Sequence, residues 1–142
     1  MSGQIRYLLD TSFVCEARKP RPDPGVLAFL QTEEPNSGFI SVLTLGELRK
    51  GVAAKRLRDP DDNAATRLAA WVEGIELSFS NRILGIDAAT ARLWGDWSAQ
   101  RPRPVVDTLL AATAVRNDLT LVTRNIRDLR GIPVKLLDPW AE

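Results

Sequence analysis

Acidic residues stand near the ends of apolar segments that lie far apart in the chain. They are Asp10, Glu47, Asp107 and Asp128, the last of them three residues after Asn125. Carboxylate oxygens are the ligands that Mg²⁺ and Mn²⁺ prefer. An ion held in this way can polarise a phosphoryl oxygen and lower the pKa of a bound water. If the fold gathers these residues, the chemistry they could perform is metal-assisted hydrolysis of a phosphodiester.

A cluster of like charges needs a compensating cation. At an effective dielectric of about 20, two carboxylates about 4 Å apart repel by on the order of 4 kcal/mol. Each residue also has a purely structural interpretation when it is taken alone. Asp10 and Asp107 could cap helices, Glu47 could close a capping box with Thr44, and Asp128 could be a solvated loop residue. As a set, the four carboxylates favour a metal site.

The composition excludes several other kinds of hydrolase. The chain has no histidine and one cysteine, Cys15. Ser–His–Asp and Cys–His nucleophiles, a Cys/His zinc site and an internal disulfide are therefore excluded. A hydrolase with this composition must use carboxylates and a hard metal ion.

Basic residues form local clusters although the net charge is only +1, which gives no overall basic field for nucleic acid. The clusters are Arg18, Lys19 and Arg21; Arg49, Lys50, Lys55, Arg56 and Arg58; Arg101 and Arg103; and Arg124, Arg127 and Arg130. They are typical of solvated helix ends and loops, but together they could flank the acidic site and hold phosphates. Thr11, Ser12 and Thr123 could orient a water or a phosphate, although capping is the commoner role of such hydroxyls.

The apolar pattern alternates between strand-like and helix-like periods. Strands are expected at 5–9, 39–42, 82–86, 119–123 and 134–137, the last at an edge. Helices are expected after Asp10, from Pro24, from a Thr44 cap, around 68–75, over 88–99 and from 105 onward. This order predicts a three-layer α/β/α fold with a mostly parallel sheet of four to five strands. The acids would then lie at the carboxyl ends of the strands, where such sheets bind ligands.

The 142 residues fit one domain spanning 1–142. No apolar run is long enough to cross a membrane. The first residues lack the features of a secretory signal, so a cytoplasmic location is expected.

Four segments together resemble the motifs of a known family. They are Tyr7-Leu-Leu-Asp-Thr-Ser, Ser41-Val-Leu-Thr-Leu-Gly-Glu-Leu-Arg-Lys-Gly, Asp107-Thr-Leu-Leu-Ala-Ala-Thr-Ala and Leu121-Val-Thr-Arg-Asn-Ile-Arg-Asp-Leu, followed by a closing Leu137-Asp-Pro-Trp. In order and spacing they resemble PIN-domain proteins, in particular the VapC toxins of toxin–antitoxin pairs and their FitB-like branch. The resemblance implies an endoribonuclease that uses Mg²⁺ or Mn²⁺. It also implies inhibition by a cognate antitoxin, a small DNA-binding protein, and assembly as a homodimer or a toxin–antitoxin hetero-oligomer.

The resemblance assigns Asp10, Glu47 and Asp107 as catalytic and metal-binding acids. Relatives differ in the fourth acid, which is either at the position of Asn125 here or three residues later. This chain has Asn125 and Asp128, so the resemblance favours Asp128 as the fourth catalytic and metal-binding acid, with Asn125 in support. Ser12 replaces an Asn that is common in the family, and we expect this to be tolerated.

Other functions fit the sequence less well. A phosphatase of the haloacid-dehalogenase type needs a second Asp two residues after the first, where this chain has Ser12. A receiver-like domain needs a late strand-end Lys, which the segment from Thr123 to Asn125 lacks. The main alternative is a non-catalytic PIN-like binding module that holds a protein partner or nucleic acid. The close pair Trp94 and Trp97 would suit such an interface, although core packing is commoner for tryptophan.

Overall fold

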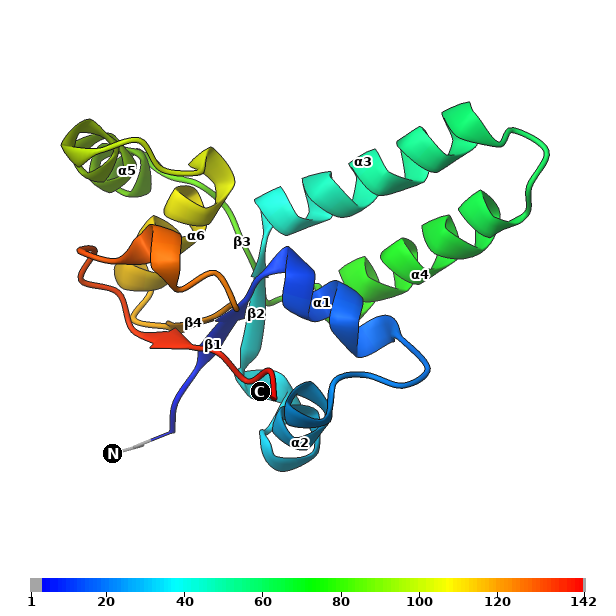
Figure 1. Cartoon of the computed structure of the whole chain (residues 1–142), viewed down its shortest axis with the longest axis horizontal. Helices are drawn as coiled ribbons and strands as arrows, with labels where there is room; N and C mark the ends of the chain where they lie inside the picture. The colour runs from blue at the N-terminus through cyan, green and yellow to red at the C-terminus, as the bar shows by residue number, and fades with distance from the viewer. Residues whose placement is uncertain (1–3, 142) are drawn as a thin grey trace.

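In the part of the chain that the structure describes, five short parallel strands form one central sheet (Figure 1). The computed structural model describes residues 4–141. The strands are β1 (Tyr7–Leu9), β2 (Gly38–Ser41), β3 (Ile83–Leu84), β4 (Thr120–Val122) and β5 (Leu136–Leu137). Their order is β3-β2-β1-β4-β5, and every pairing is parallel. The predicted sheet, including the edge position of the last strand, is confirmed. Most strands are shorter than the apolar runs that contain them.

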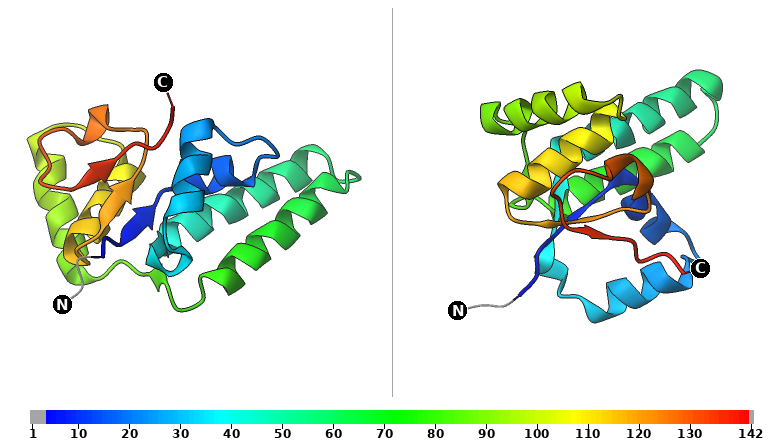
Figure 2. Two further views of the ribbon diagram at one scale, coloured as in Figure 1. Left: turned by 90° about the horizontal axis from the view of Figure 1, so that it is seen from below. Right: turned by 60° about the vertical axis from the view of Figure 1, so that its left-hand side comes forward.

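Within residues 4–141, six α-helices cover the two faces of the sheet (Figures 1 and 2). They are α1 (Thr11–Arg18), α2 (Pro24–Thr32), α3 (Val42–Arg58), α4 (Ala64–Ser78), α5 (Ala88–Gln100) and α6 (Val105–Arg116), with 3₁₀ turns η1 (Pro35–Ser37) and η2 (Arg127–Leu129). Helices α1 to α4 pack on one face, and α5 and α6 pack on the other. The predicted three-layer α/β/α arrangement is therefore confirmed.

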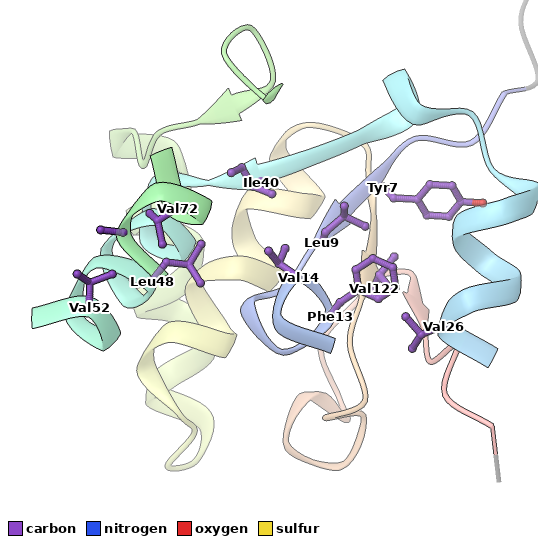
Figure 3. Packing of buried hydrophobic residues seen from close by; sticks show 11 residues of the cluster. Tyr7, Leu9, Phe13, Val14, Val26, Ile40, Leu48, Val52, Val72 and Val122 are labelled. Atoms are coloured by element: carbon purple, nitrogen blue, oxygen red, sulfur yellow. The ribbon is translucent and has the colours of Figure 1, made fainter. Parts of the chain in front are cut away.

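The central strand β1 explains the two layers. Successive side chains of a strand point to opposite faces. Tyr7 and Leu9 accordingly join the core under α1 to α4, whereas Leu8 joins the core under α5 and α6. Figure 3 shows Leu9 beside Phe13 and Val122 in the first of these cores. In the second, Trp97 is buried, as expected for a tryptophan that packs in a core rather than at an interface.

The start of α3 differs from the sequence prediction. The cap of this helix is Ser41, whose hydroxyl accepts a hydrogen bond from the Leu43 N–H at 3.0 Å. Thr44 lies inside the helix and is fully buried, so it is not the cap. Glu47 lies beyond the first turn, and the predicted capping box is wrong. Ser41 ends β2 with an extended backbone and a free acceptor, which lets the helix begin before Thr44.

The strand order places the reversal of the sheet between β1 and β4. Crossovers run outward from β1 through β2 to β3 on one side, while β4 and β5 lie on the other. The carboxyl ends of the strands at such a reversal form the usual ligand crevice of open α/β sheets. Asp10 and Thr123 directly follow these two strands, and the Asp10 N–H donates to the Val122 carbonyl at 3.1 Å. No helix within residues 4–141 is long and apolar enough to cross a membrane.

Candidate active site

Asp10 is both a helix cap and a buried acid at the end of β1. Its carboxylate accepts a hydrogen bond from the Phe13 N–H at 2.7 Å, which caps α1. Only 5% of the residue is exposed. Burial raises the pKa of Asp10; hydrogen bonds from Thr123 and Phe13 oppose that rise, and the nearby carboxylates of Asp107 and Glu47 add to it. The capping interpretation is therefore correct, and it coexists with a place among other acids.

Glu47 reaches the same region from α3. The Thr11 hydroxyl donates to Glu47 Oε1 at 2.5 Å and lies 3.1 Å from the Thr44 hydroxyl. Thr11 is the first residue of α1, directly after Asp10. The hydroxyls of Thr11 and Thr44 thus connect the starts of α1 and α3 and fix the Glu47 side chain. Thr44 supports the site, a role that sequence reasoning missed because a capping interpretation was available for it.

Asp107 approaches from the opposite layer. It is the third residue of α6, whose cap position is taken by Pro104, so Asp107 is not the cap. A carboxylate in the first turn is still favoured by the helix dipole. Asp107 Oδ2 accepts a hydrogen bond of 2.6 Å from Asn125 Nδ2. The Asn125 N–H in turn donates to the Thr123 hydroxyl at 3.0 Å, so Asn125 joins the end of β4 to α6.

Asp10, Glu47 and Asp107 line one cavity of about 310 Å³. Its walls are Asp10, Thr11, Ser12, Cys15, Glu47, Asp107 and Leu110. Three of the four predicted carboxylates, from three separate elements, therefore face the same space. As the side chains stand in residues 4–141, no three acidic or thiol groups are grouped so as to enclose a metal ion. Sequence reasoning missed Cys15 and Leu110, although each lies about one helical turn after a predicted site residue, at the spacing that shares a helix face.

Asp128 is not among the residues that line this cavity. It lies in η2 and is partly buried. Its main-chain carbonyl accepts hydrogen bonds from Arg103 at 3.2 Å and from Arg101 at 3.4 Å. The structure thus gathers Asp10, Glu47 and Asp107 around one space and ties Asn125 to it. Asp128, the predicted fourth acid, lies on the 3₁₀ turn η2 outside the cavity lining.

Several arginines of the predicted basic rim have structural partners. The guanidinium of Arg18 lies over the Trp71 ring at 5.1 Å, and that of Arg124 lies over the Trp140 ring at 5.0 Å. Arg101 and Arg103 bind the carbonyls of η2. These contacts do not prevent contact with phosphate, but they show that the clusters also stabilise the fold.

Sequence comparison identifies relatives along nearly the whole chain. The family profile described as PIN domain matches residues 7–134. A protein named VapC ribonuclease Y4jK, from Sinorhizobium fredii, is 29% identical over 139 residues, which cover 94% of this chain and 96% of that protein. Toxin FitB from Neisseria gonorrhoeae is 28% identical over 140 residues, which cover 95% of this chain and 99% of that protein.

Solved structures agree with the sequence comparison. A chain in the structure of FitAB bound to an IR36 DNA fragment superposes with a TM-score of 0.83 and 26% identity, over 96% of both chains. The similarity covers the sheet, both helical layers and the motifs that carry Asp10, Glu47 and Asp107. The chain belongs to the PIN-domain family.

Proposed function

We propose that this protein is a metal-dependent endoribonuclease that acts as the toxin of a toxin–antitoxin pair. One observation carries the proposal: Asp10, Glu47 and Asp107 come from three separate elements to line one cavity beside the reversal of the sheet. The relative from Sinorhizobium fredii is named a ribonuclease, and the relative from Neisseria gonorrhoeae is named a toxin. The absence of histidine leaves carboxylate chemistry as the route to hydrolysis.

The donor set of the cavity fits Mg²⁺ or Mn²⁺. Its ionisable groups are three carboxylates and the Cys15 thiol, and hard divalent ions prefer oxygen ligands. Asp10, Glu47 and Asp107 would hold the ion, with Asp128 on η2 as the proposed fourth acid. When bound, such an ion would lower the pKa of a bound water and would place positive charge beside the phosphodiester. Burial, and to a smaller extent the neighbouring carboxylates, raises the pKa of Asp10, so a cation at this place would favour its charged form.

The surrounding residues hold the carboxylates in place. The Phe13 N–H and the Thr123 hydroxyl fix Asp10, and Thr11 fixes Glu47. Asn125 occupies one oxygen of Asp107 and leaves the other available. Ser12 lines the cavity and is exposed. We propose that its hydroxyl orients a water or a substrate phosphate.

A cognate antitoxin is the proposed protein partner. The FitB relative is a toxin, and the solved FitAB structure is bound to a DNA fragment. By analogy, the partner of this chain is a small DNA-binding protein, and the assembly is a hetero-oligomer or contains a homodimer. We further propose a cytoplasmic location and a single nuclease domain over residues 1–142, of which the family match covers 7–134.

Purified protein incubated with structured RNA tests the activity. We expect cleavage with Mn²⁺ or Mg²⁺ and none with excess chelator. Asp10→Asn is the sharpest variant, because Asn is as good a helix cap as Asp but carries no charge. We expect it to fold normally and to lose activity by about 100-fold or more, in the range seen when one catalytic group is removed. Asp61→Asn, in an exposed loop, is the matched control and should cleave like the wild type.

The alternative binding module predicts a different pattern. It expects no cleavage by either the wild type or the variants, with binding of a protein or nucleic acid unaffected by chelator. Full activity of Asp10→Asn in a preparation shown to be free of contaminating nuclease would refute the proposed site.

A further inference from the structure

The 3₁₀ turn η2 is held by two arginines from a distant loop. Arg103 Nη1 donates to the carbonyls of Asp128 at 3.2 Å and Arg130 at 2.9 Å. Arg101 Nη2 makes longer contacts, each 3.4 Å, with the carbonyls of residues 127, 128 and 130. No side-chain hydrogen bond caps η2 at its own N-terminus. The arginines of the α5–α6 loop therefore stabilise the turn by donating to its main-chain carbonyls.

Arg103 is built into this position more firmly than Arg101. It is partly buried, and its Nη2 also donates to Gln100 Oε1 at 3.3 Å. Its Nε is buried and has no hydrogen-bond partner among residues 4–141. Gly131 has a positive φ of 89°, and a Cβ there would lie 3.7 Å from Arg103 Nη2. The turn thus bends closely around the guanidinium, and glycine provides the backbone conformation that this requires.

The Arg103 backbone is coupled to the helix that carries Asp107. The next residue, Pro104, stands at the cap of α6, and its carbonyl accepts from both the N–H and the hydroxyl of Thr108, at 3.1 and 2.7 Å. Pro104 restricts the backbone of Arg103, and Pro102 fixes its own φ directly before it. Arg103 therefore joins the entry of α6 to the turn that carries Asp128.

Two polar contacts hold the segment after β4 to α6 and to the loop before it, in addition to the packing of the buried Leu129 in the core that α6 helps to form. The first is the 2.6 Å hydrogen bond between Asn125 and Asp107, and the second is Arg103 on the carbonyls of η2. Leu129 anchors the segment in the core, and the two polar contacts fix the orientation of its backbone before and after that residue. An arginine suits this role because its planar guanidinium binds several acceptors at once, which a lysine ammonium does with less definite geometry.

We propose that Arg103 is a positioning residue of the carboxylate site, setting the orientation of the segment that carries Asn125 and Asp128 relative to Asp107. This inference rests on the proposed nuclease function. Arg103 touches neither the cavity nor its carboxylates, and it acts through the backbone of η2. Its effect should therefore fall on the rate of the chemical step and not on RNA affinity.

The test compares Arg103→Ala and Arg103→Lys with the wild type. Arg67→Met is the control, because it removes the same charge from an exposed position on α4. We expect kcat of Arg103→Ala to fall by about 10-fold or more, the loss typical of residues that orient metal ligands, while KM for RNA stays within about twofold. Guanidinium ion at millimolar concentration should restore part of the lost kcat. Arg103→Lys should lie between Arg103→Ala and the wild type, and Arg67→Met should match the wild type.

Hydrogen exchange gives a readout that needs no activity. The N–H groups of Leu129, Arg130 and Ile132 bond within the turn, and they should exchange at least about 10-fold faster in both Arg103 variants. Exchange in α3 should be unchanged. If the wild type has no ribonuclease activity, the proposed function fails, and the exchange rates still decide whether Arg103 orders the turn. If Arg103→Ala does not fold, Arg103→Lys provides the same comparison. Unchanged exchange, or an increase in KM at constant kcat, would overturn the inference.

Discussion

Cys15 is the single cysteine of the chain, and it shares a cavity with the three carboxylates. Cys15 is exposed overall, and partial desolvation of its thiol raises the pKa, so less of it is thiolate at neutral pH than in a fully solvated cysteine. Slow but complete alkylation by iodoacetamide should place an extra amide group within a space of only about 310 Å³. We expect the modified protein to lose most of its metal-dependent RNA cleavage, measured after mass spectrometry confirms one adduct.

Cys15→Ser provides the control for the alkylation. This variant cannot be alkylated at position 15, so iodoacetamide should leave its activity unchanged. A wild-type protein that carries the adduct and cleaves RNA at its original rate would show that the cavity is not the place where substrate or metal binds.

Tyr7 offers a separate residue-level test, because it is the only tyrosine. Burial, followed by a 2.8 Å hydrogen bond to the Glu33 carboxylate and the charge of that carboxylate, raises its pKa to about 12. The neutral phenol is favoured by folding, so its contribution to stability is complete below pH 10. It is lost as the pH rises from 10 to 12, because the unfolded chain releases the proton first.

Ultraviolet absorbance of the phenolate should therefore show one ionisation with a midpoint near pH 12. Glu33→Gln removes the charge and should lower the midpoint. An ionisation at pH 10 in the folded wild type, the value of a free tyrosine, would contradict the burial and hydrogen bond described here.

At the scale of the elements, the sequence predicted the α-helices and strands in the correct order, but not the 3₁₀ turns η1 and η2. The apolar periods and the cap and turn residues sufficed for that. Element ends were less accurate, as at α3, where Ser41 and Thr44 are both acceptable caps by residue type. Which one caps depends on where β2 stops pairing with its neighbours, and that is a property of the sheet. The hydrogen-bond partners of Arg103 could not be predicted either, because they are main-chain carbonyls of a distant turn, and every residue type carries such a carbonyl.

Helix α2 depends on a close contact with the C-terminal segment. A Cβ on Gly25 would lie 1.9 Å from the Pro139 carbonyl oxygen and 2.7 Å from the Ala141 nitrogen, and both are backbone atoms that cannot easily yield. The same segment is held by a 2.7 Å hydrogen bond from the Ala141 N–H to Asp23 and by Trp140 against Phe13. Gly25→Ala should displace this segment.

We expect Gly25→Ala to lower the free energy of unfolding by about 1–3 kcal/mol, the usual cost of overpacking. Urea denaturation followed by tryptophan fluorescence would measure it. Gly74→Ala is the control, since a Cβ there meets nothing within 4 Å in an exposed part of α4. It should stabilise the protein by about 0.5–1 kcal/mol through helix propensity. Equal effects of the two substitutions would mean that the contact is not made.

At the scale of the whole molecule, the carboxylate cavity and an apolar groove are separate parts of the surface. An apolar groove of about 360 Å³ runs between α2, α4 and the start of β2, and Tyr7, Phe29, Leu30 and Phe79 are among its walls. Among the residues that the structure describes, none lines both this groove and the carboxylate cavity. The motifs of the sequence predicted the three acids of the cavity. The groove could not be predicted, because aromatic and aliphatic residues at helical spacing are equally typical of a buried core.

The separation lets partner binding be tested without disturbing catalysis. Leu30 is 42% exposed and lines the groove, whereas Leu27, on the same helix and 40% exposed, does not. If the proposed antitoxin covers the groove, Leu30→Glu should weaken the complex by about 10-fold or more, because a charge would be buried against an apolar partner. Leu27→Glu should bind like the wild type, and both variants should retain nuclease activity when antitoxin is absent. Calorimetric titration with the protein encoded beside this gene would measure both affinities.

Equal affinity of the two variants would place the antitoxin on another surface. A loss of cleavage in Leu30→Glu alone would show that the groove and the carboxylate cavity are coupled through α2.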